Sequence, residues 1–163
     1  ANKYEHTLDA LPVIAIFMPL LAGLGGNIGT QSITLMVRGL STGQVTVSSA
    51  LYHIWKELRV GLLIGMFFGL IVSIVTWKWQ HNVDLGIVVG TAMMINMTMA
   101  TLLGTITPFV LKKMKVDPAI ASGPVIATTI DVLGLAIYFG LVSFYLLKQF
   151  SLHNNDPVHL IST

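Results

Sequence analysis

The feature that most constrains this chain is a set of four long stretches with almost no charged residue. They cover residues 10–37, 60–77, 85–111 and 118–147, and only Asp131 interrupts the last one. Each is at least as long as the roughly 18–20 residues that an apolar helix needs to cross a ~30 Å hydrocarbon core. Helices of a soluble bundle would show a charged face at a 3.6-residue period, and these stretches show none. The pattern predicts an all-α, polytopic membrane protein with four spanning helices.

The composition agrees with this prediction and excludes several function classes. The chain is 54% hydrophobic and 10% charged, with a mean hydropathy of +0.79. A net charge of +2, with no basic run longer than Lys112-Lys113, leaves no phosphate-binding surface, so nucleic acid is not expected as a partner. There is no cysteine, which excludes disulfides and thiolate metal sites. The spans contain no metal-binding His pair and no Ser–His or Ser–Lys arrangement, so the chain is not expected to be an enzyme.

The basic residues in the connections predict an orientation. The connections 38–59 and 112–117 hold six Lys and Arg residues, and Lys3, Lys78 and Lys148 are the other three. By the positive-inside rule these two connections face the cytoplasm, and both chain ends face outward. This is the pattern of a multi-pass protein of the cell (inner or plasma) membrane. Segment 41–58 is expected to form a short amphipathic helix along the inner surface.

The first stretch contains polar residues that a simple membrane anchor would not need. They are Asn27, Thr30, Gln31, Ser32 and Thr34, and they follow Gly23, Gly25 and Gly26, with Gly29 among them. The glycines have two interpretations: they let helices pack closely, or they open the helix with Pro19 so that carbonyls face a wet cavity. The amides and hydroxyls need partners or water at that depth. We therefore expect them to line a site or pore.

Asp131 is the only acidic residue inside the four stretches, and none of them holds a Lys, Arg or His that could pair with it. A carboxylate near the bilayer centre costs ~2.5–3.5 kcal/mol, so it is either protonated and hydrogen-bonded to a neighbouring helix or an anionic site for a cation. Asn27 lies about 16 Å from Arg38 along a helix, and Asp131 about 20 Å from Pro118. The two are expected to face each other within one turn. Asn96 is expected to form a hydrogen bond between helices. It is also the one, less favoured, candidate for a second polar site.

Two motifs resemble a known family. The segment 19–39, with its Gly25-Gly26-Asn27 core, is similar to the second transmembrane helix of the MgtE-type magnesium channels. The segment 117–138, with Ser122-Gly123-Pro124 and then Thr129-Ile130-Asp131, is similar to their last helix. The two motifs occur in the family's order, and the resemblance covers nearly the whole chain.

This resemblance implies a fold and an assembly. Residues 1–163 would form the transmembrane ion-conducting domain, with the last four helices of a five-helix unit. The pore would lie at a homodimer interface, and the family's first helix and cytoplasmic gating domains would lie outside this chain. The partners implied are a second copy, membrane lipid, Mg²⁺ and a cytoplasmic gating domain.

The resemblance also implies a site. The family aspartate that faces the hydrated ion falls on Asp131, and the family glycine–asparagine stretch falls on Gly25, Gly26 and Asn27. Ala127 and Thr128, one turn before Asp131, complete the expected site for the transported Mg²⁺. A small hard cation that dehydrates reluctantly fits one carboxylate with nearby carbonyls and amides, which agrees with this assignment.

Three functions remain open from the sequence. The first is a magnesium channel that conducts the hydrated ion through a dimeric pore. The second is a divalent cation carrier coupled to protons or sodium, in which Asp131 alternates between ions. The third is a non-transporting membrane scaffold, in which Asp131 only holds subunits together.

Overall fold

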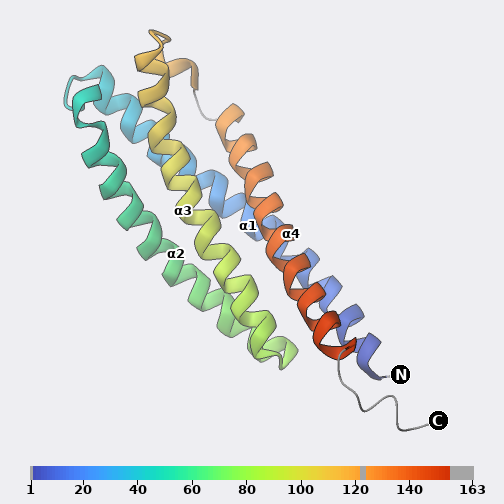
Figure 1. Cartoon of the computed structure of the whole chain (residues 1–163). Coiled ribbons are helices and arrows are strands. Elements are labelled where there is room, and N and C mark those ends of the chain that lie inside the picture. The colour runs from blue at the N-terminus through green and yellow to red at the C-terminus, as the bar shows by residue number, and fades with distance from the viewer. Residues whose placement is uncertain (1, 122–123, 155–163) are drawn as a thin grey trace.

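The computed structural model describes residues 2–121 and 124–154, with side-chain surroundings for 15–119 and 127–145. Its elements are α1 (Asn2–Ser41), η1 (Val47–Ser49), α2 (Ala50–Gln80), α3 (Val83–Lys113), η2 (Pro118–Ala121) and α4 (Pro124–Asn154). The all-α prediction is confirmed for the described residues. Helices α2 and α3 pack side by side and antiparallel, while α1 packs against α3 and α4 (Figure 1).

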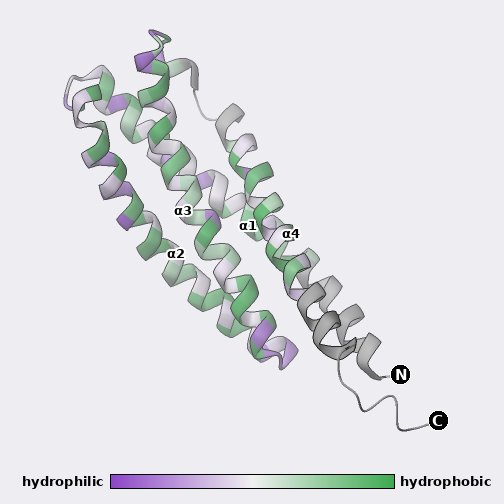
Figure 2. Cartoon of the chain, viewed as in Figure 1, coloured by the Kyte–Doolittle hydropathy of each residue, from purple (hydrophilic) through white to green (hydrophobic). Residues whose placement is uncertain are grey.

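Three segments of the described part are long and apolar enough to cross a membrane. They are Val47–Gln80, Val83–Lys113 and Ala127–Tyr145, and Figure 2 shows hydrophobic residues recurring along the coloured parts of these segments. The predicted span over 10–37 corresponds to α1, which is not among these three. The described part of α1 includes the segment 23–34, where glycine, amide and hydroxyl residues lower the hydropathy.

Two predicted boundaries are wrong. Segment 41–58 does not form a separate surface helix, because α2 begins at Ala50 and continues unbroken to Gln80. No glycine or proline interrupts residues 50–60, so the charges in this region do not end the helix. The last helix does not begin at 118 either: η2 covers Pro118–Ala121, and α4 begins at Pro124. Proline suits the first helical turn, where its missing N–H is not needed. Ser122 and Gly123 of the predicted motif lie outside the described residues.

Helices α2 and α3 approach each other closely because glycines face the contact. A Cβ on Gly69 would lie 2.6 Å from the carbonyl oxygen of Gly90, and a Cβ on Gly90 would lie 2.6 Å from that of Gly69. At the next turn, a Cβ on Gly65 would lie 2.8 Å from the carbonyl oxygen of Met94. Such small residues let the backbones of membrane helices touch. The two helices therefore form one tightly packed antiparallel pair.

The core lies on α3, which contacts the other three helices. Its apolar cluster joins side chains from all four: Phe17, Leu21, Val72, Leu85, Val89, Ala92, Met93, Met97, Tyr138 and Val142. With α3 at the centre, α1 and α4 are held on one side of it and α2 on another (Figure 1). The contact between α1 and α4 positions the candidate site.

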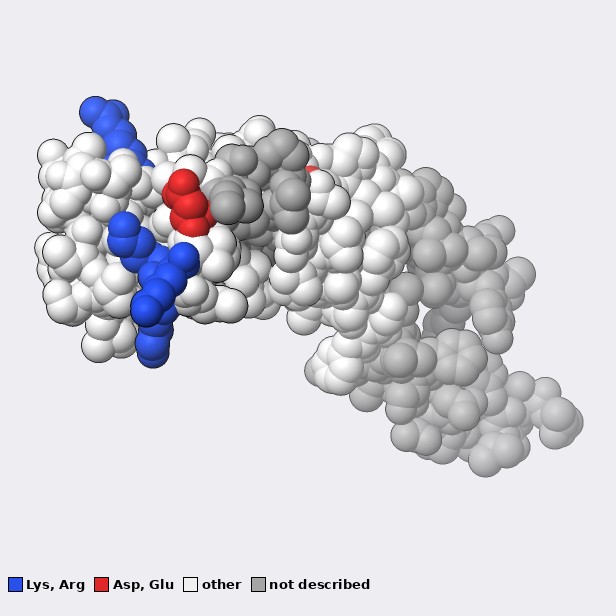
Figure 3. All heavy atoms as spheres, turned by 90° about the horizontal axis from the view of Figure 1, so that it is seen from above, with Lys and Arg blue, Asp and Glu red and all other residues white. Residues whose placement is uncertain are grey.

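Lysine and arginine residues gather at one end of the bundle. This is the end where α1 and α3 finish and α2 begins, and it holds Arg38, Lys56, Arg59, Lys112, Lys113 and Lys115. Figure 3 views the molecule from this end and shows the basic side chains there. Lys78 lies at the other end of α2. The two ends of the bundle therefore differ in their number of Lys and Arg residues, as the sequence analysis expects. Which end faces the cytoplasm stays a prediction.

Candidate cation site

Gly26 of α1 and Asp131 of α4 lie in direct contact. A Cβ added to Gly26 would lie 2.7 Å from Oδ1 of Asp131, so no other residue at position 26 leaves the carboxylate where it is. The expectation that α1 and Asp131 meet at this level is therefore confirmed for Gly26, whereas the side chain of Asn27 is exposed. Helix α4 begins at Pro124, six residues after the expected start at Pro118, but Asp131 still lies well inside the helix.

The carboxylate of Asp131 is only partly enclosed. Asp131 is half-buried as a residue, but its Oδ1 atom is shielded from solvent and accepts no hydrogen bond within the part of the chain that the structure describes. A shielded carboxylate oxygen without a donor is costly, since such groups lose their hydration without compensation. Within one copy, Asp131 thus has hydrogen-bonding capacity that no described group uses.

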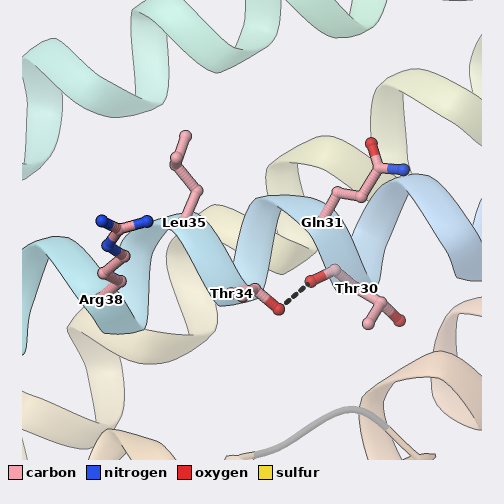
Figure 4. Close-up of a pocket in the computed structure, with 5 residues that line it drawn as sticks. All are labelled: Thr30, Gln31, Thr34, Leu35 and Arg38. Carbon is pink, nitrogen blue, oxygen red and sulfur yellow. Dashed lines mark hydrogen bonds between the residues drawn. The ribbon is translucent and has the colours of Figure 1, made fainter.

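The helix face next to this contact is polar and exposed. Gly23, Asn27, Gln31 and Thr34 are exposed in this chain, and their spacing of three or four residues puts them on one side of α1. Toward the basic end, this face borders a hollow of about 270 Å³ lined by Thr30, Gln31, Thr34, Leu35 and Arg38 (Figure 4). An exposed amide and hydroxyl face at membrane depth requires water or protein against it.

Two threonines on α1 bond back to their own helix. The Thr30 hydroxyl donates to the Gly26 carbonyl oxygen at 2.8 Å. The Thr34 hydroxyl donates to the Thr30 carbonyl oxygen at 2.8 Å, the bond drawn in Figure 4. These carbonyls therefore carry a second hydrogen bond in place of a free lone pair. The interpretation in which Pro19 and the glycines open α1 is wrong, because the helix is continuous from Asn2 to Ser41.

The glycines of α1 have different surroundings. A Cβ on Gly25 would meet the amide of Asn96 at 2.8 Å, and one on Gly29 would collide with Ile130, so both glycines serve close helix packing. Gly23 has no atom within 4 Å of such a Cβ. The packing interpretation is correct for Gly25 and Gly29 and does not explain Gly23, which lies on the exposed polar face.

The other predicted site residues flank the contact. Asn27 follows Gly26 directly and its side chain is exposed, while Ala127 is half-buried and Thr128 exposed on the turn of α4 before Asp131. Among the described residues, no three His, Cys, Asp or Glu side chains gather in a metal-binding cluster. Within one copy, a cation at Asp131 would have to keep water ligands or use backbone and amide oxygens.

Sequence reasoning missed a buried acidic residue outside the site. Glu57 was assigned to the surface helix, but it is 7% exposed and accepts a hydrogen bond from the Ser32 hydroxyl at 3.2 Å. It also borders a second hollow of about 370 Å³, which Arg38 and Lys56 line as well. Ser32 was recognised as a polar residue that needs a partner. The pairing between α1 and α2 depends on how the helices pack, which the sequence does not display.

Comparisons with known proteins relate this chain to divalent cation transporters. The MgtE family model, described as a divalent cation transporter, matches residues 18–141. The "Magnesium transporter MgtE" of Bacillus subtilis is 40% identical over 145 residues, which cover 89% of this chain and 32% of the relative. Proteins of the same name from Enterococcus faecalis and Thermus thermophilus are each 38% identical, again over 32% of the relative and 89% and 88% of this chain. The chain therefore spans about a third of the length of the curated relatives it matches.

Proposed function

The chain belongs to the MgtE family of divalent cation transporters, and from that premise we propose that it conducts hydrated magnesium across the cell membrane. The path is a passive channel at the interface between two copies of the chain. The family is one of transporters, not of enzymes. Three relatives carry the name magnesium transporter, which supports magnesium as the physiological ion.

The observation that carries the proposal is the carboxylate of Asp131 against Gly26. One oxygen of that carboxylate is shielded and lacks a donor within the described residues, and the exposed amide of Asn27 follows Gly26 on α1. Magnesium is a small hard ion that keeps several of its waters and binds through one or two carboxylates. Asp131 supplies the charge, while Asn27, Thr128 and the backbone carbonyl of Ala127 accept hydrogen bonds from the ion's waters. Gly26 contributes the space in which the carboxylate lies.

A second copy of the chain completes this arrangement. The exposed polar face of α1 cannot lie against lipid without leaving amides and hydroxyls unsatisfied, at a cost of several kcal/mol for each group. If the same face of another copy lies opposite, the two faces enclose water and bring two Asp131 carboxylates to one ion. The second, third, fourth and fifth helices of the family's domain correspond in this proposal to α1–α4, all of which span the membrane.

The test is magnesium uptake into liposomes that contain the purified protein, with Asp131→Asn as the variant. Asparagine keeps the shape and hydrogen-bonding capacity but removes the charge. We expect the variant to assemble normally, and we expect the apparent KM for Mg²⁺ to rise about 10- to 100-fold, as befits the loss of a charged ligand. Selectivity over Na⁺ should fall as well.

The matched control is Thr91→Val. Thr91 is exposed on α3, and its hydroxyl donates to the Ile87 carbonyl oxygen of the same helix at 2.7 Å. Its uptake should equal that of the unmodified protein. Unchanged uptake and selectivity in Asp131→Asn would remove the carboxylate from transport and favour the scaffold. Movement of protons or sodium in a fixed ratio to magnesium would replace the channel by the coupled carrier.

A further inference from the structure

Asn96 of α3 occupies the junction of three helices. Its side chain is 2% exposed, and its Nδ2 atom donates a hydrogen bond of 2.7 Å to the carbonyl oxygen of Leu21 on α1. A buried amide at membrane depth needs such a partner. The bond fixes where α1 lies against α3.

Two glycines make room for this amide, one on each side. A Cβ on Gly25 of α1 would lie 2.8 Å from Nδ2 of Asn96. A Cβ on Gly134 of α4 would collide with Oδ1 of Asn96 and would lie 2.8 Å from its Cγ. The Asn96 amide is therefore held between the backbones of α1 and α4 and acts as a spacer of fixed thickness between them.

Both glycines lie next to the candidate cation site. Gly25 precedes Gly26 in α1, and Gly134 lies one turn after Asp131 in α4. A change in the thickness or position of the Asn96 amide therefore moves Gly26 relative to Asp131. Close packing gives neighbouring groups little room to absorb such a change elsewhere.

We propose that Asn96 is a positioning residue for cation binding at Asp131. It sets the distance and register between α1 and α4, so that the carboxylate of Asp131 stays against Gly26 with one oxygen directed at the ion's waters. Asn96 does not touch the ion in this proposal, which rests on the proposed function of Asp131. Groups that support a metal ligand without binding the metal commonly change its affinity 10- to 100-fold when they are altered.

The experiment measures the dependence of uptake on magnesium concentration in liposomes that contain the purified protein. Asn96→Leu keeps a similar volume and removes the hydrogen bond to Leu21. Gly134→Ala keeps Asn96 but pushes its amide away from α4. We expect each variant to raise the apparent KM for Mg²⁺ about tenfold, while the maximal flux per folded protein changes less than about twofold.

Two controls separate positioning from general packing. Gly140→Ala makes the same substitution on α4 at a position where a Cβ meets nothing within 4 Å, and its KM should not change. In the double variant Asn96→Ala with Gly134→Ala, the Cβ added at position 134 occupies the space that the Asn96 amide leaves. The double variant should therefore raise the KM no more than Asn96→Ala alone. Such non-additivity is expected for residues in contact.

Several results would overturn the inference. An unchanged KM in Gly134→Ala, or in a folded Asn96→Leu variant, would show that the amide does not position the site. Additive effects of Asn96→Ala and Gly134→Ala would do the same. Asp131→Asn is measured in parallel: if it loses affinity while the Asn96 and Gly134 variants do not, only the positioning inference fails. If Asp131→Asn binds and transports magnesium normally, the proposed function itself fails.

Discussion

The candidate site depends on a missing side chain as much as on a charged one. Gly26 is buried, and the 2.7 Å between its hypothetical Cβ and Oδ1 of Asp131 is shorter than real carbon–oxygen contacts. The Thr30 hydroxyl donates to the carbonyl oxygen of Gly26, so that carbonyl is already occupied within α1. The backbone at Gly26 therefore forms one wall of the space in which the carboxylate lies.

Replacing Gly26 by leucine should block transport. The added side chain displaces the Asp131 carboxylate and fills the space beside it, so we expect magnesium uptake to fall at least about tenfold, in line with other changes next to a metal ligand. Membrane expression should remain, because Gly26 contacts the Asp131 side chain and does not belong to the apolar core cluster. Uptake assays with matched protein amounts measure this, with Gly140→Ala as the control. Normal uptake by a well-expressed leucine variant would mean that Gly26 only fills a helix contact.

At the scale of elements, the sequence predicted which segments are helical better than where they end. Charged residues marked the limits of the apolar stretches, but helices continue past those limits. Glu57 shows why: Ser32 on another helix donates to its carboxylate, so a charge that appeared to lie outside the span is buried within α2. Likewise, η2 separates Pro118 from the start of α4, and loop geometry of this kind has no periodic signal.

Only part of the candidate site could be predicted from the sequence, and the reason is physical. Depth along a helix follows from a rise of ~1.5 Å per residue, so the level shared by Gly26 and Asp131 can be calculated. The rotation of each helix about its axis depends on packing between helices. Asn96 was therefore expected to bond between helices, but its place between Gly25 and Gly134 appears only in the structure.

The close contact of α2 and α3 leads to a prediction about stability. In Gly69→Val, the new side chain meets the carbonyl oxygen of Gly90, since even a Cβ would lie only 2.6 Å away. Overpacking of this kind typically costs ~1–3 kcal/mol, so the thermal unfolding temperature in detergent should fall. Phe67→Leu is the control, because Phe67 is 62% exposed on the same helix. Equal unfolding temperatures for the two variants would contradict the tight pairing of α2 and α3.

At the scale of the whole molecule, the central feature is the unequal exposure of the helix faces. Helix α2 exposes large apolar side chains such as Leu63, Phe67 and Leu70, which suit contact with lipid. Helix α1 exposes Asn27, Gln31 and Thr34, which do not. The two faces therefore need different neighbours, and the proposed dimer would cover the polar face of α1 with a second copy.

Crosslinking tests this arrangement directly. The chain has no cysteine, so a single introduced cysteine identifies one position. We expect Gly23→Cys, on the exposed face of α1, to form disulfide-linked dimers in membranes under mild oxidation, because residues close to the two-fold axis of a symmetric interface lie opposite their own copies and the proposed axis runs along this face. Phe67→Cys, on the exposed apolar side of α2, should stay monomeric under the same conditions. Only monomers with Gly23→Cys in a functional preparation would contradict the dimer.

The most direct test of the central claim is magnesium flux through mixed dimers of unmodified and Asp131→Asn copies. The two forms are co-expressed in known proportions, purified together and reconstituted in liposomes. If both carboxylates hold one ion, then at a magnesium concentration far below the apparent KM only dimers of two unmodified copies conduct appreciably. Flux then falls with the square of the unmodified fraction, so an equal mixture retains about one quarter of the full flux when copies pair at random. Flux that falls in direct proportion to the unmodified fraction would mean that each copy conducts alone, and it would contradict a site shared by two Asp131 residues.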